Sequence, residues 1–143
     1  MKFGGIMVEQ LAVFIENKPG RLQEITRVLG GAGIDLRTLS IADTNDFGIL
    51  RAITSDNKKA AKALRDKGFT VTTNNLICVE VPDKPGGLAS VLAILDDAQI
   101  GVEYLYSFAH TNDKRAVILF RAEDDAKAAG VLKKSGVKLL DSI

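Results

Sequence analysis

Several residue types that often carry chemistry in proteins are scarce in this sequence. Its 143 residues include one cysteine, Cys78, one histidine, His110, and no tryptophan. A single cysteine excludes an intramolecular disulfide and a zinc site built on cysteines. No combination of nucleophile, base and metal ligands is recognisable, and no Gly-rich loop precedes a helix in the manner of a phosphate site. We therefore expect a protein that is not an enzyme and needs no cofactor or metal, with Cys78 as a small core residue.

The chain also lacks an excess of charge of either sign. It has 19 basic and 18 acidic side chains, a formal net charge of +1, and this balance provides no basic face for nucleic acid. The apolar runs are far shorter than a membrane span. Residues 1–5 lack the apolar core of a signal peptide. The expectation is a cytoplasmic protein with neither nucleic acid nor membrane as a partner.

What the sequence does contain is an internal repeat. Residues 17–22, NKPGRL, recur 66 positions later as residues 83–88, DKPGGL. Over residues 11–41 most apolar positions stay apolar in the second copy, and beyond residue 55 the copies align at an offset of 68. The two additional residues fall near 110–114, a polar stretch typical of an exposed turn. The chain is therefore predicted to be two copies of one unit.

Each copy shows the same order of predicted elements. In the first copy we expect strands over 8–15, 34–42, 47–54 and 69–73, helices over 22–32 and 58–67, and a turn at 44–46. In the second copy we expect strands over 76–81, 101–109, 115–121 and 137–140, and helices over 87–98 and 125–134. The order βαββαβ predicts an α+β protein of two tandem ferredoxin-like modules, residues 1–73 and 74–143. Each would have an antiparallel sheet with both helices on one face.

One strand suggests what covers the other face of the sheet. Residues 11–15 are all apolar, and alternate residues of a strand face opposite sides of the sheet. We therefore expect both faces of this strand to be covered. A single module would leave one face bare. Packing against another module, within the chain or across a homodimer, would remove this exposure.

The repeated Lys-Pro-Gly segment follows the first strand of each copy and opens a helix. Proline suits the entry to a helix, and glycine permits a positive φ and close backbone approach. The first N–H groups of the helix have no partner within it and favour an anion such as the carboxylate of an amino acid. Asn17 and Asp83, which precede the two turns, could accept an ammonium group. The same pattern also fits a plain strand-to-helix turn, with Lys18 and Lys84 solvated.

Asp35 begins the second strand of the first copy. In a ferredoxin-like unit this strand starts near the far end of the first helix, so Asp35 is not expected to reach Asn17 of its own module. It would either meet the Pro-Gly loop of a partner module or be a solvated residue at the end of a strand.

Taken together, the Pro-Gly turn, the helix ending in Gly-x-Gly-Ile and the following Asp35 resemble the ACT domain, as does the second copy. The resemblance implies a regulatory protein that binds amino acids or similar small metabolites and acts on an attached or partner enzyme. In family members that bind serine, the ligand lies between paired modules, held by an asparagine before the Pro-Gly turn and another at the start of the neighbour's next strand. These positions are Asn17 and Asp35 in the first copy, and Asp83 and Gly101 in the second.

The resulting hypothesis is a non-catalytic sensor that binds a free amino acid at the interface between modules and forms a homodimer, with a regulated enzyme as a further partner. The candidate ligand-binding residues are Asn17, Lys18, Pro19, Gly20, Arg21, Leu22, Ile34, Asp35, Leu36, Asp83, Lys84, Pro85, Gly86, Gly87 and Leu88. The alternative is a ferredoxin-like module for protein or RNA interaction without a small-molecule ligand. Its best feature is the row Tyr104, Tyr106 and Phe108 on one strand face, but without a basic cluster around these rings, packing in a core or interface is the favoured explanation.

Overall fold

The computed structural model describes residues 7–43, 47–109 and 115–143. The predicted turns at 44–46 and 110–114, His110 and residues 1–5 lie outside the described part. The chain divides into two compact units. We call residues 9–74 the N-terminal unit, and residues 75–143 with residues 7 and 8 the C-terminal unit.

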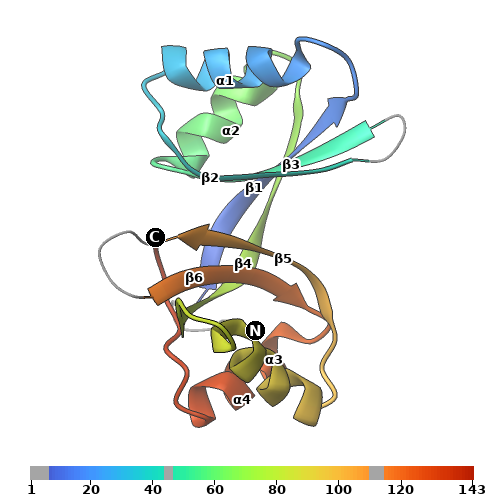
Figure 1. Ribbon diagram of the computed structural model, residues 1–143. Helices are drawn as coiled ribbons and strands as arrows, with labels where there is room; N and C mark the ends of the chain where they lie inside the picture. The colour runs from blue at the N-terminus through green and yellow to red at the C-terminus, as the bar shows by residue number, and fades with distance from the viewer. Residues whose placement is uncertain (1–6, 44–46, 110–114) are drawn as a thin grey trace. The chain divides into compact units, whose positions relative to one another are not determined.

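The N-terminal unit has the predicted order of elements. They are β1 (Met7–Glu16), α1 (Arg21–Gly31), β2 (Leu36–Asp43), β3 (Phe47–Thr54), α2 (Asn57–Asp66) and the first part of β4 (Thr70–Pro82). The strand order is β2-β3-β1-β4, with antiparallel pairs that include Val13 opposite Leu50 and Ile41 opposite Leu50. Both helices lie on one face of this sheet (Figure 1).

The C-terminal unit repeats this arrangement. It contains the rest of β4, α3 (Gly87–Asp97), β5 (Val102–Ala109), β6 (Arg115–Ala122) and α4 (Asp125–Lys134). The order β4-β6-β5 is antiparallel, with Val79 opposite Ile118 and Phe120 opposite Leu105. Helices α3 and α4 lie together on one face of these strands (Figure 1). The predicted doubled ferredoxin-like fold is confirmed.

Two predicted strand boundaries differ from the structure. The strands expected over 69–73 and 76–81 are one continuous strand, β4, because no proline or glycine interrupts residues 70–81. The strand expected over 137–140 forms only an isolated antiparallel bridge, Val79 to Leu139. The backbone N–H groups of Glu80 and Leu140 complete this short pairing by donating to the carbonyls of Lys138 and Cys78, at 3.1 and 2.8 Å.

Alternating positions build the core of each unit. In β1, Leu11, Val13 and Ile15 point toward α1 and α2 and are 1–7% exposed. The corresponding residues of β4, Ile77, Val79 and Val81, do the same beneath α3 and α4. This alternation is the period of two expected for a sheet with one face covered by helices.

On the opposite face of β1, the single chain leaves aromatic side chains exposed. Phe14 is 47% exposed and Phe47, beside the same end of the sheet, is 57% exposed, so covering of this face by a partner module stays a prediction. An apolar pattern at both parities indicates that a strand can be buried on both faces, but it does not determine what lies over the second face.

Candidate ligand-binding loops

The two Pro-Gly loops have the backbone conformation that their sequences predict. Gly20 and Gly86, which immediately precede α1 and α3, adopt φ of 90° and 86° in the left-handed region. This conformation is easy for glycine and strained for residues with a Cβ. A methyl group at either position would meet nothing within 4 Å, so both loops open outward.

The starts of the first and second helices of each unit differ. Asp56 and Asp124 cap α2 and α4 by accepting a hydrogen bond, each at 3.0 Å, from the backbone N–H of Lys59 and Lys127. No side chain in the described part of the chain caps α1 or α3. The second and third N–H groups of α1 and α3 are thus left for solvent or an anionic ligand.

Turn bonds within each loop occupy the first N–H group of the helix and leave the ones that follow. In the first loop the N–H of Lys18 donates to the carbonyl of Glu16 at 2.8 Å, and the N–H of Arg21 reaches the carbonyl of Lys18 at only 3.4 Å. The corresponding bond in the second loop, from Gly87 to Lys84, is shorter, at 3.0 Å. The first loop is therefore the looser of the two turns.

A cavity of 160 Å³ opens beside the first loop, lined by Asn17, Lys18, Arg21 and Leu22 from the loop and by Ile15, Ile41 and Gly48 from the sheet, with Glu16 at its edge. Asn17, Lys18, Pro19 and Gly20 are all exposed. The Lys18 side chain is solvent-exposed, and its Nζ lies 2.7 Å from Glu16 Oε2. This hydrogen bond, with the nearby positive charge, lowers the pKa of Glu16 below its ordinary value of 4.5.

Arg21 interacts with both acidic and aromatic neighbours of the first loop. Its guanidinium lies 3.1 Å from Glu24 and 3.6 Å from Glu16, and its Cζ is 4.9 Å from the centre of the Phe69 ring. The Nε atom is buried, with no hydrogen-bond partner in the described part of the chain. A second cavity, of 200 Å³, lies against Arg21 and is lined also by Phe14, Phe47 and Phe69. Sequence reasoning missed these three aromatic residues.

Asp35 lies at the other end of the N-terminal unit, as predicted. Its backbone N–H donates to the Ser55 hydroxyl and its carbonyl accepts from the Ser55 N–H, both at 2.9 Å. Ser55 is seven residues along from Gly48, about 23 Å for an extended strand. Ile34 is buried in the core and Leu36 packs against it, so only Asp35 of this trio is exposed.

The second unit fills the corresponding position differently. Gly101 takes the place of Asp35, and a Cβ there would lie 2.5 Å from the Glu123 carboxylate. The backbone N–H of Glu123 donates to the Gly101 carbonyl at 3.0 Å, just as Ser55 donates to Asp35. Glu123 thus brings a carboxylate to the start of β5, where residue 101 itself carries no side chain. Comparing positions 55 and 123 at the offset of 68 would have been the signal for it.

The second loop is closed more tightly around its glycine. Gly87 is buried, and a Cβ there would come within 2.0 Å of the Pro82 carbonyl oxygen. Asp83, Lys84, Pro85 and Gly86 are exposed. Leu88 packs against the C-terminal core, whereas its counterpart Leu22 is 37% exposed.

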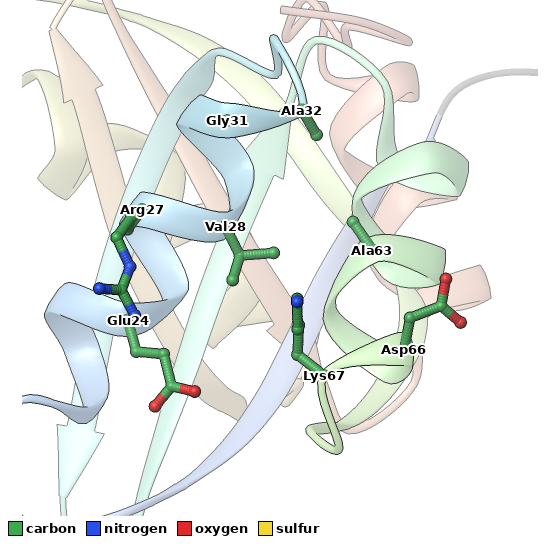
Figure 2. Close-up of a pocket in the computed structure, with 8 residues that line it drawn as sticks. All are labelled: Glu24, Arg27, Val28, Gly31, Ala32, Ala63, Asp66 and Lys67. Carbon is green, nitrogen blue, oxygen red and sulfur yellow. The ribbon is translucent and has the colours of Figure 1, made fainter.

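A larger groove, of 760 Å³, runs between α1 and α2 (Figure 2). Val28 and Ala63 lie between the helices. Glu24 and Arg27 on α1 line the groove on one side, and Asp66 on α2 and the next residue, Lys67, line it on the other. Each wall carries one charge of each sign, so the groove offers no net charge to an ionic ligand. None of the predicted ligand-binding residues lines it.

The remaining candidates for chemistry have ordinary structural surroundings. Cys78 is buried, and burial together with the nearby Glu80 carboxylate raises the pKa of its thiol to about 12. Tyr104, Tyr106 and Phe108 are half-buried. Within the described residues, no three potential metal ligands cluster, and no helix is long and apolar enough to span a membrane.

Two βαββαβ units with uncapped Pro-Gly helix starts define a tandem regulatory domain of the ACT type. The chain matches the ACT domain pair over residues 6–142 and belongs to this family, whose domains are regulatory and not catalytic. None of the functionally curated proteins matches it significantly.

Solved structures support the same assignment. Protein BT0572 from Bacteroides thetaiotaomicron is 43% identical, with a TM-score of 0.88, over 94% of this chain and 92% of that one. The regulatory subunit of aspartate kinase from Thermus thermophilus, in a ligand-free form, is 15% identical with a TM-score of 0.60, over 88% and 91% of the two chains. The regulatory subunit of aspartate kinase from Thermus flavus is 16% identical with a TM-score of 0.57, over 90% of this chain and 92% of that one. At these identities the two aspartate kinase subunits show a shared fold.

Proposed function

We propose that this protein is a non-catalytic cytoplasmic sensor that binds a free amino acid, or a similar small zwitterion, and regulates a partner enzyme. The observation that carries the proposal is the contrast between helix starts. Both second helices are capped by an aspartate, whereas no side chain among the described residues caps either helix that follows a Pro-Gly turn. Unused N–H donors at a helix start suit a carboxylate, and the same design occurs twice in one chain.

In the proposed complex the ligand carboxylate accepts hydrogen bonds from N–H groups at the start of α1. The side-chain oxygen of Asn17, at the mouth of the 160 Å³ cavity, would accept from the ammonium group. An affinity in the micromolar to millimolar range, about −4 to −8 kcal/mol, would suit a metabolite sensor.

A second protomer would complete this site. β2 is the end strand of the N-terminal sheet, and Leu39 and Ile41 on it are 47% and 42% exposed. If two copies of β2 pair antiparallel about a two-fold axis, the start of one strand meets the end of the other. Asp35 of the partner subunit would then approach Ile41, which lines the cavity beside the first loop. This arrangement would give the ammonium group a carboxylate partner in addition to Glu16, which is paired with Lys18 and Arg21 of its own module.

The test is a titration of the full chain with each of the twenty amino acids, by thermal shift and then by calorimetry. At least one should raise the melting temperature at millimolar concentration, because a ligand bound only to the folded state stabilises it. No stabilisation by any amino acid would refute the proposal.

Gly20→Val and Gly86→Val form a matched pair that locates the site. Each places a β-branched residue at a φ near 90° in open space, so each should cost about 1–2 kcal/mol of stability without a clash. Gly20→Val should abolish binding at the first loop, and Gly86→Val should remove only binding at the second, read out as calorimetric stoichiometry. If Gly20→Val leaves affinity and stoichiometry unchanged, the first loop is not part of the site.

A further inference from the structure

Because the two units are copies of one another, the 200 Å³ cavity beside Arg21 can be compared with the equivalent place in the C-terminal unit. At the established offsets, Phe14, Phe47 and Thr70 of the N-terminal unit correspond to Glu80, Arg115 and Lys138 of the C-terminal unit. The strand registers agree: Glu16 lies opposite Phe47 in the first unit, and Pro82 lies opposite Arg115 in the second. The two sets of side chains therefore occupy equivalent places on equivalent scaffolds.

In the C-terminal unit these positions are closed by ion pairs. Glu80 Oε2 lies 3.5 Å from Arg115 Nε and 3.5 Å from Lys138 Nζ, and the Glu80 side chain is only 16% exposed. The residue that corresponds to Arg21 is Gly87, which has no side chain to place there. Charged side chains that satisfy one another leave no apolar surface for a ligand.

In the N-terminal unit the same place is open and aromatic. Phe14 and Phe47 are about half exposed at its rim, Phe69 forms its buried wall, and Arg21 lies over the Phe69 ring. A closed apolar cavity of about 150 Å³ can hold a benzene ring. This cavity measures 200 Å³, is open to solvent and combines the three aromatic rings with polar groups of Glu16, Arg21 and Thr70. Aromatic rings also pack favourably against other rings in edge-to-face or offset arrangements.

Arg21 connects this cavity to the first loop. It lines both the aromatic cavity and the cavity beside Asn17, and its buried Nε has no acceptor in the described part of the chain. A carboxylate at the start of α1 would supply an acceptor close to that donor. A molecule with a ring a few atoms from a carboxylate matches this pair of adjoining cavities.

We propose that the cavity framed by Phe14, Phe47, Phe69 and Arg21 is a side-chain subsite that makes the N-terminal unit selective for aromatic amino acids. The C-terminal unit, with Glu80, Arg115 and Lys138 in place of the aromatic rim, has no such subsite. This inference rests on the proposed function, since it names the ligand class of the same site.

The experiment is calorimetric titration of the full chain with L-phenylalanine, L-tyrosine, L-serine and L-aspartate. Phenylalanine or tyrosine should bind about ten-fold or more tightly than serine, because only they fill the subsite. Binding of serine or aspartate with equal or greater affinity than phenylalanine would overturn the subsite and leave the proposed sensor intact. No binding by any of the four would overturn the subsite, and the screen of all twenty amino acids then decides the sensor separately.

The double variant Phe14→Glu, Phe47→Arg tests the residues directly by giving the N-terminal unit the pair found in the C-terminal unit. Both positions are exposed, so the fold should be retained, as checked by circular dichroism. The preference for phenylalanine over serine should fall about ten-fold or more, as it should for the milder Phe14→Ala. Leu105→Ala, at a 40% exposed apolar residue of the other unit, is the control and should keep the preference. An unchanged preference in both Phe variants would overturn the proposal.

Discussion

Gly87 shows how a single residue makes the two loops differ in structure. Its missing side chain lets the chain pass so close to Pro82 that a Cβ would lie 2.0 Å from the carbonyl oxygen. The corresponding residue of the first loop, Arg21, has a full side chain between two cavities. The same turn is therefore built tightly in one copy and loosely in the other.

We predict that Gly87→Ala destabilises the protein by about 1–3 kcal/mol, because the backbone must move to relieve the overlap. Gly130→Ala is the control in the same unit, since Gly130 lies within α4 with nothing within 4 Å of an added Cβ. That change should stabilise by about 0.5–1 kcal/mol through the helix preference of alanine. Urea denaturation of both variants is the measurement, and equal effects would contradict the close approach at Gly87.

The pKa of Glu16 reports on its interaction with Lys18 in the first loop. The hydrogen bond and charge of Lys18 lower its pKa below 4.5 in the folded protein, so the ionised form stabilises the fold. This contribution is fully present above pH 4.5 and is lost as the pH falls through the lower folded-state pKa. A carboxyl NMR titration should give a midpoint below 4.5, and Lys18→Met should return it toward the ordinary value. A midpoint at or above 4.5 in the unaltered protein would show that the ion pair does not form in solution.

At the scale of elements, the helices divide into two kinds by how they begin. The second helix of each unit starts with an aspartate whose side chain completes the first turn, whereas the first helix starts with a left-handed glycine. A cap contributes stability within the chain, while an open helix start is less stable alone and available to a ligand. In our proposal, stability comes from one kind of helix and binding from the other.

Asp56→Ala should therefore cost about 1 kcal/mol of stability, and Asp124→Ala a similar amount, as measured by thermal denaturation. Neither change should alter ligand affinity, because both caps belong to the second helices. A loss of affinity in Asp56→Ala without loss of stability would place α2, not α1, at the site.

At the scale of the whole molecule, the proposed sensor requires two protomers. A charged residue on an exposed edge strand opposes pairing with a second copy. Leu39→Lys on β2 should therefore shift the protein toward monomer in sedimentation experiments and weaken amino acid binding together with dimerisation. In the unaltered protein, bound amino acid should lower the dissociation constant of the dimer. By linkage, it should do so by the same factor by which dimerisation lowers the dissociation constant of the amino acid.

Leu105→Lys is the matched control, because Leu105 occupies the equivalent place on β5 of the C-terminal unit and is 40% exposed. It should leave the β2 dimer intact. Dissociation by Leu105→Lys but not by Leu39→Lys would assign the interface to the C-terminal unit and contradict the shared site.

Most of the architecture could be predicted from sequence, because it depends on local signals that the duplication states twice. The helix over 125–134 and the strand over 47–54 agree with the structure to the residue. The boundary between the units, near residues 72–75, was harder to predict. A strand that continues from one unit into the next has no break in its sequence pattern at the boundary. The final strand was overestimated, because an apolar run indicates burial but not how many ladder bonds form.

The repeat can be read directly from the chain, and the order βαββαβ and the glycine-dependent turns follow from residues close together within each copy. Which side chains meet at the end of each sheet depends instead on tertiary contacts. Phe14, Phe47 and Phe69 are far apart in sequence, and Glu80, Arg115 and Lys138 equally so. Whether such residues form an open aromatic cavity or a closed ion network depends on strand register and on the packing of β4, which no single segment specifies.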